Sequence, residues 1–246
     1  MKVTIIGCWG AYPAPGNATS GYLFECDGFT LLVDCGSGVL SRLQQFVKVE
    51  EVDAVLLSHY HHDHIADIGP LQYACLVTNT LNETKNILPI YGHDEEPEKF
   101  RSLTHQYTEG VAYDPSRTLQ TGPFTIDFQK TSHPVPCYGM KITDGTSTVV
   151  YTADTSYTDD WIAFSHQADL LITDTNFYKG MDGKGPGHMT STEAARIAAK
   201  GEVNTLWLSH LPHFGQLTKL KQEAEDVFSG TIQIAQEGLS WKGPKE

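Results

Sequence analysis

Four of the chain's eleven histidines lie within six consecutive residues, directly after an apolar segment. The apolar segment, residues 54–57, predicts a buried strand that ends in a polar loop. Alternate side chains of an extended chain point to the same side, so His59 and His61 can bind one metal ion. Asp63 and His64 follow at a predicted helical turn, and the change of direction turns them towards a second ion. The alternative is a solvated, histidine-rich loop, but packing imidazoles beside a carboxylate without a cation costs desolvation energy. We therefore predict a metal site, and this one segment can supply ligands to two metal ions.

The composition predicts one large domain over residues 1–246. A hydrophobic fraction of 40% supplies an ample core, and no linker or internal repeat divides the chain. The N-terminal apolar run is too short for a signal sequence, and no segment approaches a transmembrane length. We therefore expect a cytoplasmic protein that does not contact membranes. Five scattered cysteines without a C-x-x-C pattern indicate buried free thiols.

The net charge limits the kinds of partner that the chain can bind. Seventeen Lys and Arg residues against thirty Asp and Glu residues give a formal charge of −13. Such a charge disfavours the capture of a long polyanion, and no basic cluster marks an extended nucleic-acid groove. A local cationic pocket for a small anionic substrate is compatible with this balance.

Further candidate site residues stand at the ends of predicted strands. Asp34 follows the strand predicted at 29–33, and it either caps the next helix or orients a metal-bound histidine through its other ring nitrogen. Spacing alone leaves both roles open. His133 lies in a proline-rich turn that presets its direction. Asp154 either bridges two cations with its carboxylate or starts a turn, and the histidine segment at 59–64 favours the bridging role. His210 repeats the pattern of a strand followed by a histidine.

Other histidines have less defined roles. His188 lies just before a capping-box pattern at 190–193, and a helix N-terminus favours an anion. Its alternative role is that of a capping or surface histidine. His62 either supports the neighbouring ligands or packs in its loop. We expect His93 and His105 to be exposed, because they flank or lie in a polar segment at 95–107 that predicts a surface helix.

The order and spacing of these candidate residues resemble the sequence motifs of the metallo-β-lactamase superfamily. A segment of the form H-x-H-x-D-H at 59–64 is followed by the three strand-end residues, with Asp34 upstream. The resemblance covers about residues 2–235. It implies an α/β fold, a four-layer αββα sandwich with the site at one edge between the sheets. By resemblance, one zinc ion is bound by His59, His61 and His133, the other by Asp63, His64 and His210, and Asp154 bridges them. Manganese or iron are the expected substitutes.

Within the superfamily, the chain is more similar to the ribonuclease Z-like phosphodiesterases. Asn17 and Ser20 lie in a segment that resembles the early Asn/Ser loop of this branch, which implies that they bind substrate. His188 resembles its additional histidine. Ribonuclease Z carries a long arm for transfer RNA between the positions of His133 and Asp154, but here only 21 positions separate them. Processing of transfer RNA 3′ ends is therefore disfavoured.

These residues predict a binuclear zinc hydrolase, with a small or short-nucleotide phosphodiester as the first substrate class. Two zinc ions about 4 Å apart would hold a bridging water and lower its pKa, which gives a hydroxide nucleophile. Asp63 would help to orient the water, and His188 would bind the phosphate or protonate the leaving oxygen. A lactonase or carboxyl-ester hydrolase with the same site is the second hypothesis, and a non-catalytic metal-binding protein is the third. The resemblance to ribonuclease Z also suggests a homodimer.

Overall fold

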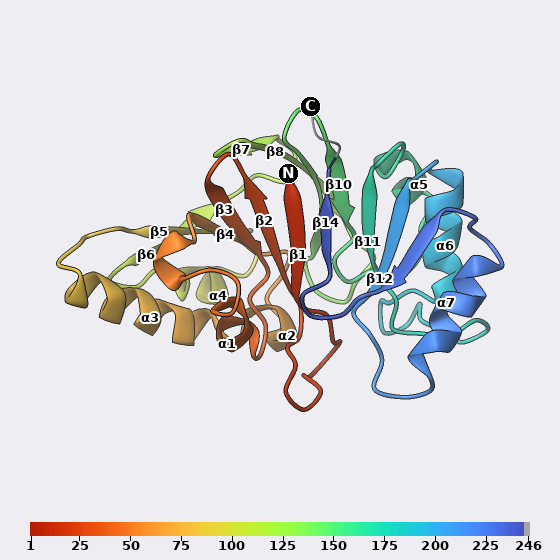
Figure 1. The fold of residues 1–246 in the computed structure, drawn as a ribbon, viewed down its shortest axis with the longest axis horizontal. Coiled ribbons are helices and arrows are strands. Elements are labelled where there is room, and N and C mark those ends of the chain that lie inside the picture. Colours follow the sequence, from red (N-terminus) through yellow and green to blue (C-terminus); the bar gives the residue numbers. More distant parts are fainter. Residues whose placement is uncertain (244–246) are drawn as a thin grey trace. The chain divides into compact units, whose positions relative to one another are not determined.

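The computed structural model describes residues 1–243, which divide into two compact units. Unit 1 comprises Met1–Asp114, Thr121–Pro123 and Gln236–Lys242, and unit 2 comprises Pro115–Gln120, Phe124–Ala235 and Gly243. Each unit contains one seven-stranded sheet and its own helices (Figure 1). The prediction of a single domain stays a prediction.

The sheet of unit 1 mixes antiparallel and parallel strands. Its order is β14 (Ser240–Lys242), β1 (Lys2–Gly7), β2 (Gly21–Cys26), β3 (Phe29–Val33), β4 (Ala54–Leu56), β5 (Leu88–Gly92) and β6 (Thr108–Ala112). Strands β2 and β3 form an antiparallel hairpin. The pairs from β3 to β6 are parallel. The carboxyl ends of parallel strands meet at one edge of a sheet, and this edge places the polar residues that follow β3 and β4 next to each other.

The helices of unit 1 bury apolar residues against this sheet. They are α1 (Val39–Leu43), the short 3₁₀ helix η1 (Val49–Glu51), α2 (His62–Ile65), α3 (Ile68–Leu81) and α4 (Pro97–Arg101). Leu43 of α1 and Leu71 of α3 belong to the same buried cluster as Leu32, Val55 and Ile90 of the sheet. Because the core lies against the strands that precede the histidine segment, it fixes the position from which that segment leaves the sheet.

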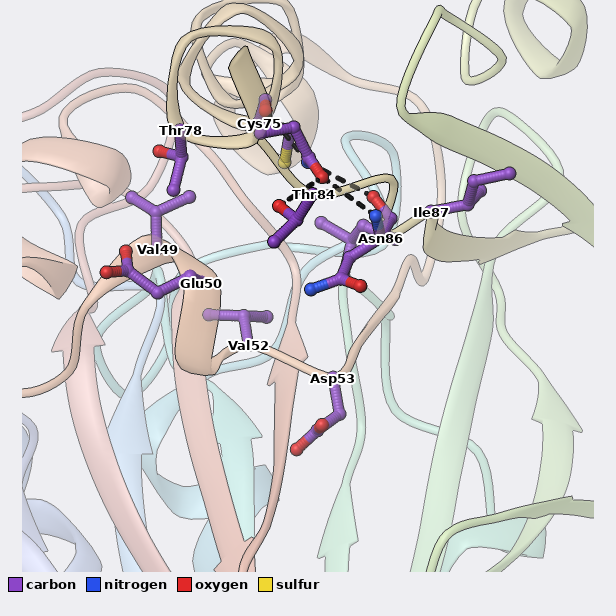
Figure 2. Close-up of a pocket in the computed structure, with 11 residues that line it drawn as sticks. Val49, Glu50, Val52, Asp53, Cys75, Thr78, Thr84, Asn86 and Ile87 are labelled. Carbon is purple, nitrogen blue, oxygen red and sulfur yellow. Dashed lines mark hydrogen bonds between the residues drawn. The ribbon is translucent and has the colours of Figure 1, made fainter. Parts of the chain in front are cut away.

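The loop between α3 and β5 is held by Asn79. The side chain of Asn79 is buried, and its Oδ1 accepts hydrogen bonds from Thr84 Oγ1 (2.9 Å) and the backbone N–H of Asn86 (2.7 Å). These residues line a small cavity of about 170 Å³ together with residues of η1 (Figure 2). Asn79 therefore has a structural role in unit 1.

The sheet of unit 2 is also mixed. Its order is β13 (Thr231–Ile234), β12 (Thr205–Ser209), β11 (Leu170–Asp174), β10 (Thr148–Tyr151), β9 (Tyr138–Thr143), β8 (Phe124–Lys130) and β7 (Leu119–Thr121). Strands β9 and β10 form an antiparallel hairpin. The pairs from β10 to β13 are parallel. Three consecutive strands, β10 to β12, therefore end at one edge of the sheet.

Unit 2 contains α5 (Asp160–Phe164), α6 (Ser191–Lys200) and α7 (Leu217–Glu225). Figure 1 shows α6 and α7 next to each other beside the sheet. The predicted capping box is confirmed, because Thr190 Oγ1 accepts from the backbone N–H of Glu193 while the Glu193 carboxylate accepts from that of Thr190. This cap satisfies donors at the start of α6 and fixes where the preceding loop meets the helix.

Two expectations about the polar segment at 95–107 are wrong. The segment forms only the short helix α4, and His105 pairs with Thr108 in an isolated bridge before β6. His93 is buried with 1% exposure, because its ring packs 4.5 Å from that of Tyr60. His105 is exposed, as expected.

The cysteines of the described chain are free thiols, as predicted, and four of them are buried, whereas Cys26 is half-buried. Burial raises the pKa of Cys8 to about 12 and that of Cys75 to about 11. High pKa values keep these thiols protonated and unreactive. Within residues 1–243, none of the helices is both long and apolar enough to cross a membrane.

Candidate metal centre

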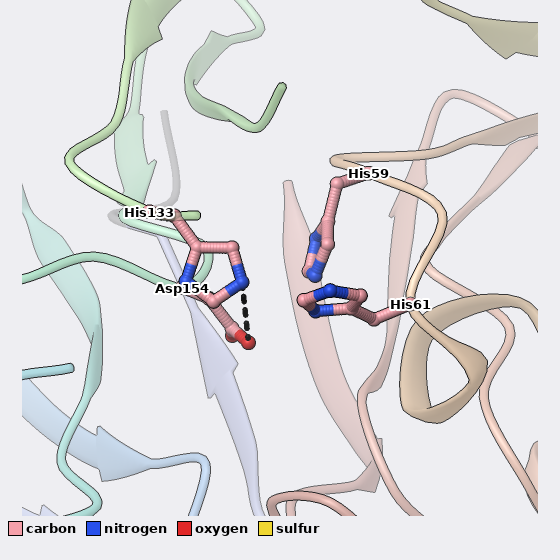
Figure 3. Close-up of side chains that lie close together, drawn as sticks. All are labelled: His59, His61, His133 and Asp154. Atoms are coloured by element: carbon pink, nitrogen blue, oxygen red, sulfur yellow. Dashed lines mark ion pairs between the residues drawn. The ribbon is translucent and has the colours of Figure 1, made fainter. Parts of the chain in front are cut away.

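The site residues of unit 1 follow the parallel strands β3 and β4. Val33 and Leu56 are paired in register, so Asp34 and Ser58 leave the sheet at the same edge. His59 and His61 follow (Figure 3), with ring centroids 4.8 Å apart, and the backbone of His61 is extended. His61 is the N-cap of α2, which carries Asp63 and His64. The predicted change of direction within the segment is therefore observed.

Asp34 is completely buried and organises this edge. Its carboxylate accepts from the backbone N–H of Ser58 (2.8 Å) and from Ser58 Oγ (2.9 Å), and it lies 2.8 Å from His64 Nδ1. The residue does not cap a helix, because the N-cap of α1 is Gly38. Of the two roles considered from sequence, the contacts support orientation of His64.

Asp63 and Ser20 also converge on His64. Asp63 Oδ2 lies 3.7 Å from His64 Nε2 and accepts from the backbone N–H of Ala11 (2.8 Å), while Ser20 Oγ lies 3.4 Å from the same Nε2. The turn after Asp34 packs against this segment so closely that a Cβ on Gly36 would clash with the backbone oxygen of Asp63. Glycine is therefore required at position 36.

Two predicted residues have other positions in unit 1. The side-chain amide of Asn17 donates to the backbone oxygen of Pro15 (3.0 Å), which ties it to its own loop. His62 is exposed at the start of α2. Their predicted roles in substrate binding and in ligand support stay predictions.

The site residues of unit 2 follow β10, β11 and β12. Asp154 comes after β10, and its Oδ2 lies 3.3 Å from Nε2 of His210, which comes after β12. The same oxygen lies 4.0 Å from His133 Nε2 (Figure 3). His133 Nδ1 lies 3.1 Å from the backbone oxygen of Gly187, a residue with φ of +82° at which a Cβ would press on the His133 ring. Asp154 is thus the carboxylate that His133 and His210 share.

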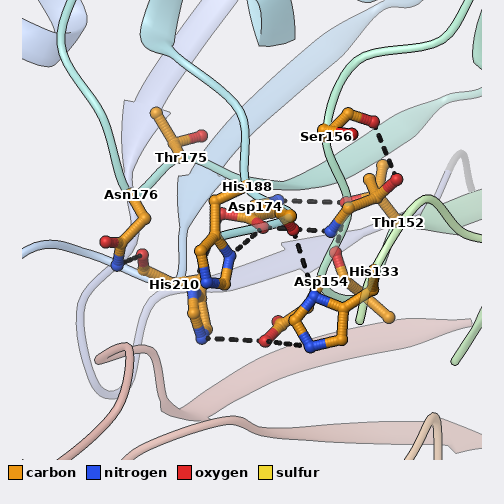
Figure 4. Close-up of polar contacts among 12 residues, drawn as sticks. His133, Thr152, Asp154, Ser156, Asp174, Thr175, Asn176, His188 and His210 are labelled. Atoms are coloured by element: carbon orange, nitrogen blue, oxygen red, sulfur yellow. Dashed lines mark hydrogen bonds and ion pairs between the residues drawn. The ribbon is translucent and has the colours of Figure 1, made fainter. Parts of the chain in front are cut away.

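Sequence reasoning missed Asp174, the last residue of β11. Its Oδ2 lies 2.7 Å from His188 Nδ1 and accepts from the backbone N–H of Thr155 (3.1 Å), and its Oδ1 lies 3.5 Å from His210 Nδ1 (Figure 4). The rings of His188 and His210 stack at 4.9 Å. One potential ligand atom from each of four residues lies within 4.8 Å of the others: Asp154, Asp174, His188 and His210. The available signal was the position of Asp174 at a buried strand end, as for Asp34 and Asp154.

Charge and burial set the protonation of this cluster. Burial disfavours the charged form of His188, but the Asp174 carboxylate outweighs it and raises the pKa of His188 above 6.5. Burial likewise opposes the charged form of Asp174, yet His188 and His210 lower the pKa of its carboxyl. Burial lowers the pKa of His133, against the opposing effect of Asp154. His133 is therefore neutral and His188 is cationic over a wider pH range.

These shifts predict the pH dependence of an Asp174→Asn variant. A raised histidine pKa adds stability that is complete below pH 6.5 and is lost as the pH rises through the raised value. The lowered pKa of Asp174 adds stability that is present above pH 3.8 and is lost as the pH falls through the lowered value. The decrease in the free energy of unfolding caused by Asp174→Asn should therefore be largest between pH 3.8 and pH 6.5. The decrease should be smaller above the His188 pKa.

Unfolding of the metal-free protein at several pH values, with NMR titration of the His188 ring, measures both effects. His166→Ala provides the control, because His166 is exposed in the same unit. An unchanged His188 pKa in the Asp174→Asn variant would contradict the assignment.

The histidine geometry fits metal ligation. The Nδ1 atoms of His64 and His133 face oxygen acceptors, the Asp34 carboxylate and the Gly187 carbonyl. An acceptor at Nδ1 places the proton there and leaves Nε2 as the ligand atom, which is the usual second contact of a metal-bound histidine. Imidazole and carboxylate donors suit zinc, manganese and iron. The donor set therefore fits a transition-metal ion.

Comparison with known proteins gives the family. The model of the β-lactamase superfamily domain matches residues 30–211, about three quarters of the chain. The chain belongs to the β-lactamase superfamily. A Bacillus subtilis (strain 168) protein named "Probable metallo-hydrolase YhfI" is 57% identical over 244 residues, which cover 99% of this chain and all of that protein. The chain is accordingly a metal-dependent hydrolase of this superfamily.

Solved structures agree with the sequence comparison. The crystal structure of the Bacillus protein, described as a metallo-β-lactamase fold protein, has a TM-score of 0.97 at 56% identity and covers 98% of this chain and 99% of that one. This similarity confirms the predicted fold class. A diphosphatase from the PhnP family has a TM-score of 0.76 at 18% identity, with 99% of this chain and 98% of that chain covered.

The similarity to ribonuclease Z is confirmed as well. Ribonuclease Z from the archaeon Haloferax volcanii is 26% identical over 306 residues, which cover 99% of this chain and 95% of that protein. In this chain, the segment between His133 and Asp154 is occupied by the β9–β10 hairpin and its connections.

Proposed function

We propose that the chain is a binuclear zinc-dependent phosphodiesterase that acts on a small or nucleotide-type phosphodiester. The proposed metal ligands are the seven residues that the resemblance implies: His59, His61, Asp63, His64, His133, Asp154 and His210. Support comes from Asp34 and Gly187, which orient His64 and His133 so that Nε2 is the ligand atom. Bound metal ions supply Lewis acidity, which generates a nucleophile from water at neutral pH and stabilises charge on a phosphoryl oxygen.

The observation that carries the choice of a phosphodiester is His188. Its Nδ1 is held by Asp174 at 2.7 Å, and the carboxylate raises the pKa of the ring. An imidazole whose cationic form is favoured by a neighbouring carboxylate, 4.9 Å from the ring of a proposed ligand, His210, suits an anionic substrate. It can also donate a proton to a leaving oxygen. A carbonyl substrate would have less need of a fixed cation at this position.

Metal analysis combined with two substrate classes tests this proposal. We expect two zinc ions per chain and hydrolysis of bis(p-nitrophenyl) phosphate by the zinc-loaded protein. His59→Ala should bind less metal and lose this turnover, whereas His105→Ala, an exposed control, should behave like the wild type. Hydrolysis of a chromogenic lactone without phosphodiester turnover would replace the proposal with a lactonase. Fewer than two ions at saturation, with neither activity, would overturn it.

A further inference from the structure

A cavity of unit 2 adjoins the segments that follow the site-bearing strands. It has a volume of about 390 Å³, within the size range of small-molecule sites, which is roughly 300–1,000 Å³. Its walls come from residues 178–181, after β11, and residues 214–219, which end the loop after β12 and begin α7. We call it the aromatic-lysine pocket. It is lined by Tyr178, Lys179, Met181, Phe214, Gly215, Gln216 and Lys219.

A series of aromatic contacts connects this pocket to His188. The ring of Phe177 lies 6.2 Å from that of His188 and 6.3 Å from that of Phe214. Tyr178 lies 5.8 Å from Phe214, and its hydroxyl donates to the Phe214 backbone oxygen at 3.0 Å. The rings of His188 and Phe214 are therefore separated by a single aromatic ring, that of Phe177.

Two apolar side chains of the pocket are exposed. Phe214 is 45% exposed and Met181 is 43% exposed. Exposed apolar groups that line a concave surface indicate a binding site, because water leaves them when a ligand binds. The face of an aromatic ring is specific for another flat ring, so an aromatic ligand fits better than an aliphatic one.

The pocket also carries positive charge on a chain whose net charge is −13. Lys219 Nζ lies 5.7 Å from the centre of the Tyr178 ring. The ammonium groups of Lys179 and Lys219 have acidic neighbours only at 3.9 and 3.6 Å, and both side chains are about 60% exposed. The pair of Lys179 with Asp226 is exposed on both sides and therefore weak, whereas Lys219 pairs with the largely buried Glu223. Both ammonium groups still face solvent and can attract an anionic ligand.

The pocket is held in place by a buried carboxylate. Glu223 of α7 accepts hydrogen bonds from the backbone N–H of Lys179 (2.8 Å) and from Ser191 Oγ at the start of α6. Glu223 is only 8% exposed. The walls of the pocket are thereby fixed to the two helices of unit 2, and a preformed wall lowers the entropy cost of binding.

We propose that the aromatic-lysine pocket binds the nucleobase of a nucleotide-type phosphodiester, with the base on Phe214 and the lysines attracting the anionic backbone. This inference rests on the proposed function and specifies its substrate class. A base stacked on an aromatic side chain is a sequence-tolerant mode of recognition, and its loss on substitution by alanine costs roughly tenfold in affinity.

Two chromogenic substrates distinguish this pocket from general activity. The first, the p-nitrophenyl ester of thymidine 5′-phosphate, carries a base, and the second, methyl p-nitrophenyl phosphate, does not. In the zinc-loaded protein, Phe214→Ala should lower kcat/KM for the first by roughly tenfold and leave the second unchanged. Phe46→Ala is the matched control, because Phe46 is an exposed phenylalanine (38%) of unit 1.

The lysine contribution has its own control on the same helix. Lys219→Gln should raise KM for the nucleotide ester about three-fold at low salt, and the effect should disappear at high ionic strength. Lys221→Gln should have no such effect, although Lys221 also pairs with a glutamate four residues later, at 3.7 Å.

Binding to the metal-free protein separates this inference from the proposed function. NMR titration should show that adenosine 5′-monophosphate binds more tightly than ribose 5-phosphate, and that Phe214→Ala removes the difference. If the wild type hydrolyses no phosphodiester but this difference is found, the proposed function fails and the pocket stands. If phosphodiesters are hydrolysed but Phe214→Ala changes neither the substrate preference nor the binding difference, the pocket assignment is overturned.

Discussion

Replacement of Asp34 with alanine is expected to lower the free energy of unfolding by about 3–5 kcal/mol, because it removes one partner of a buried, hydrogen-bonded pair. The carboxylate holds Ser58 and His64 at distances between 2.8 and 2.9 Å, and no solvent reaches it. Metal affinity should fall roughly 10- to 100-fold as well, since His64 loses the group that orients it. Urea unfolding of the metal-free protein and competition with a zinc chelator measure the two effects separately.

Asp53→Ala is a matched control for this experiment. Asp53 directly precedes β4. Like Asp34, it has a carboxylate that accepts a hydrogen bond from a backbone N–H, that of Thr30, at 2.7 Å. Because Asp53 is exposed, its loss should cost only about 1 kcal/mol and leave metal affinity unchanged. Equal metal affinity in Asp34→Ala and the wild type would contradict the orienting role. Asp34→Asn, which keeps the acceptor for Ser58, should retain more stability than Asp34→Ala.

Replacement of His188 with alanine should lower phosphodiester turnover by roughly 10²- to 10⁴-fold while both metal ions stay bound. His188 is 4.9 Å from the ring of His210 and is held by Asp174, so it is placed to act on a substrate without being needed as a ligand in the proposed set. Metal content by mass spectrometry and kcat at saturating substrate measure this outcome. Normal turnover in the variant would refute a role for His188, and His166→Ala controls for the loss of a histidine.

The leaving group distinguishes the two roles of His188. If the ring protonates the leaving oxygen, the variant should lose much more activity with phenyl esters than with p-nitrophenyl esters, because p-nitrophenolate needs little protonation. If the ring binds the phosphate, the two losses should be equal. Loss of folding or of metal in the variant would instead indicate a structural role.

Much of the candidate site was predictable because its residues follow a local rule. Polar residues at the ends of buried strands are visible in the sequence, and parallel pairing then brings Asp34 to Ser58 and Asp154 to Asp174 and His210. The histidine segment was equally clear, since its spacing is set within six residues. The capping box before α6 was also predicted correctly, because short-range contacts determine it.

The rest depends on contacts between residues that are distant in sequence. Asp174 was missed because its partner, His188, follows only after a loop of 13 residues. The burial of His93 results from packing against Tyr60, which no local pattern shows. The polar segment before β6 contains few apolar residues that could pack a longer helix against the sheet. Only the short helix α4 therefore forms there. Sequence reasoning also gave no indication of the pocket formed by residues 178–181 and 214–219.

The strand ends that carry the candidate site have an unusual backbone. Asp34, Ala153 and His210 all adopt the left-handed region, with φ between 51° and 58°. A non-glycine residue in this region costs on the order of 1–3 kcal/mol, and it persists only where the surrounding structure enforces it. The sheets therefore supply the stability that keeps these residues strained. Glycine at position 153 would relieve this strain and would be favoured by selection for thermal stability alone. The same change would fix the orientation of Asp154 less firmly. Stability and the orientation of a site residue are therefore opposing requirements at this position.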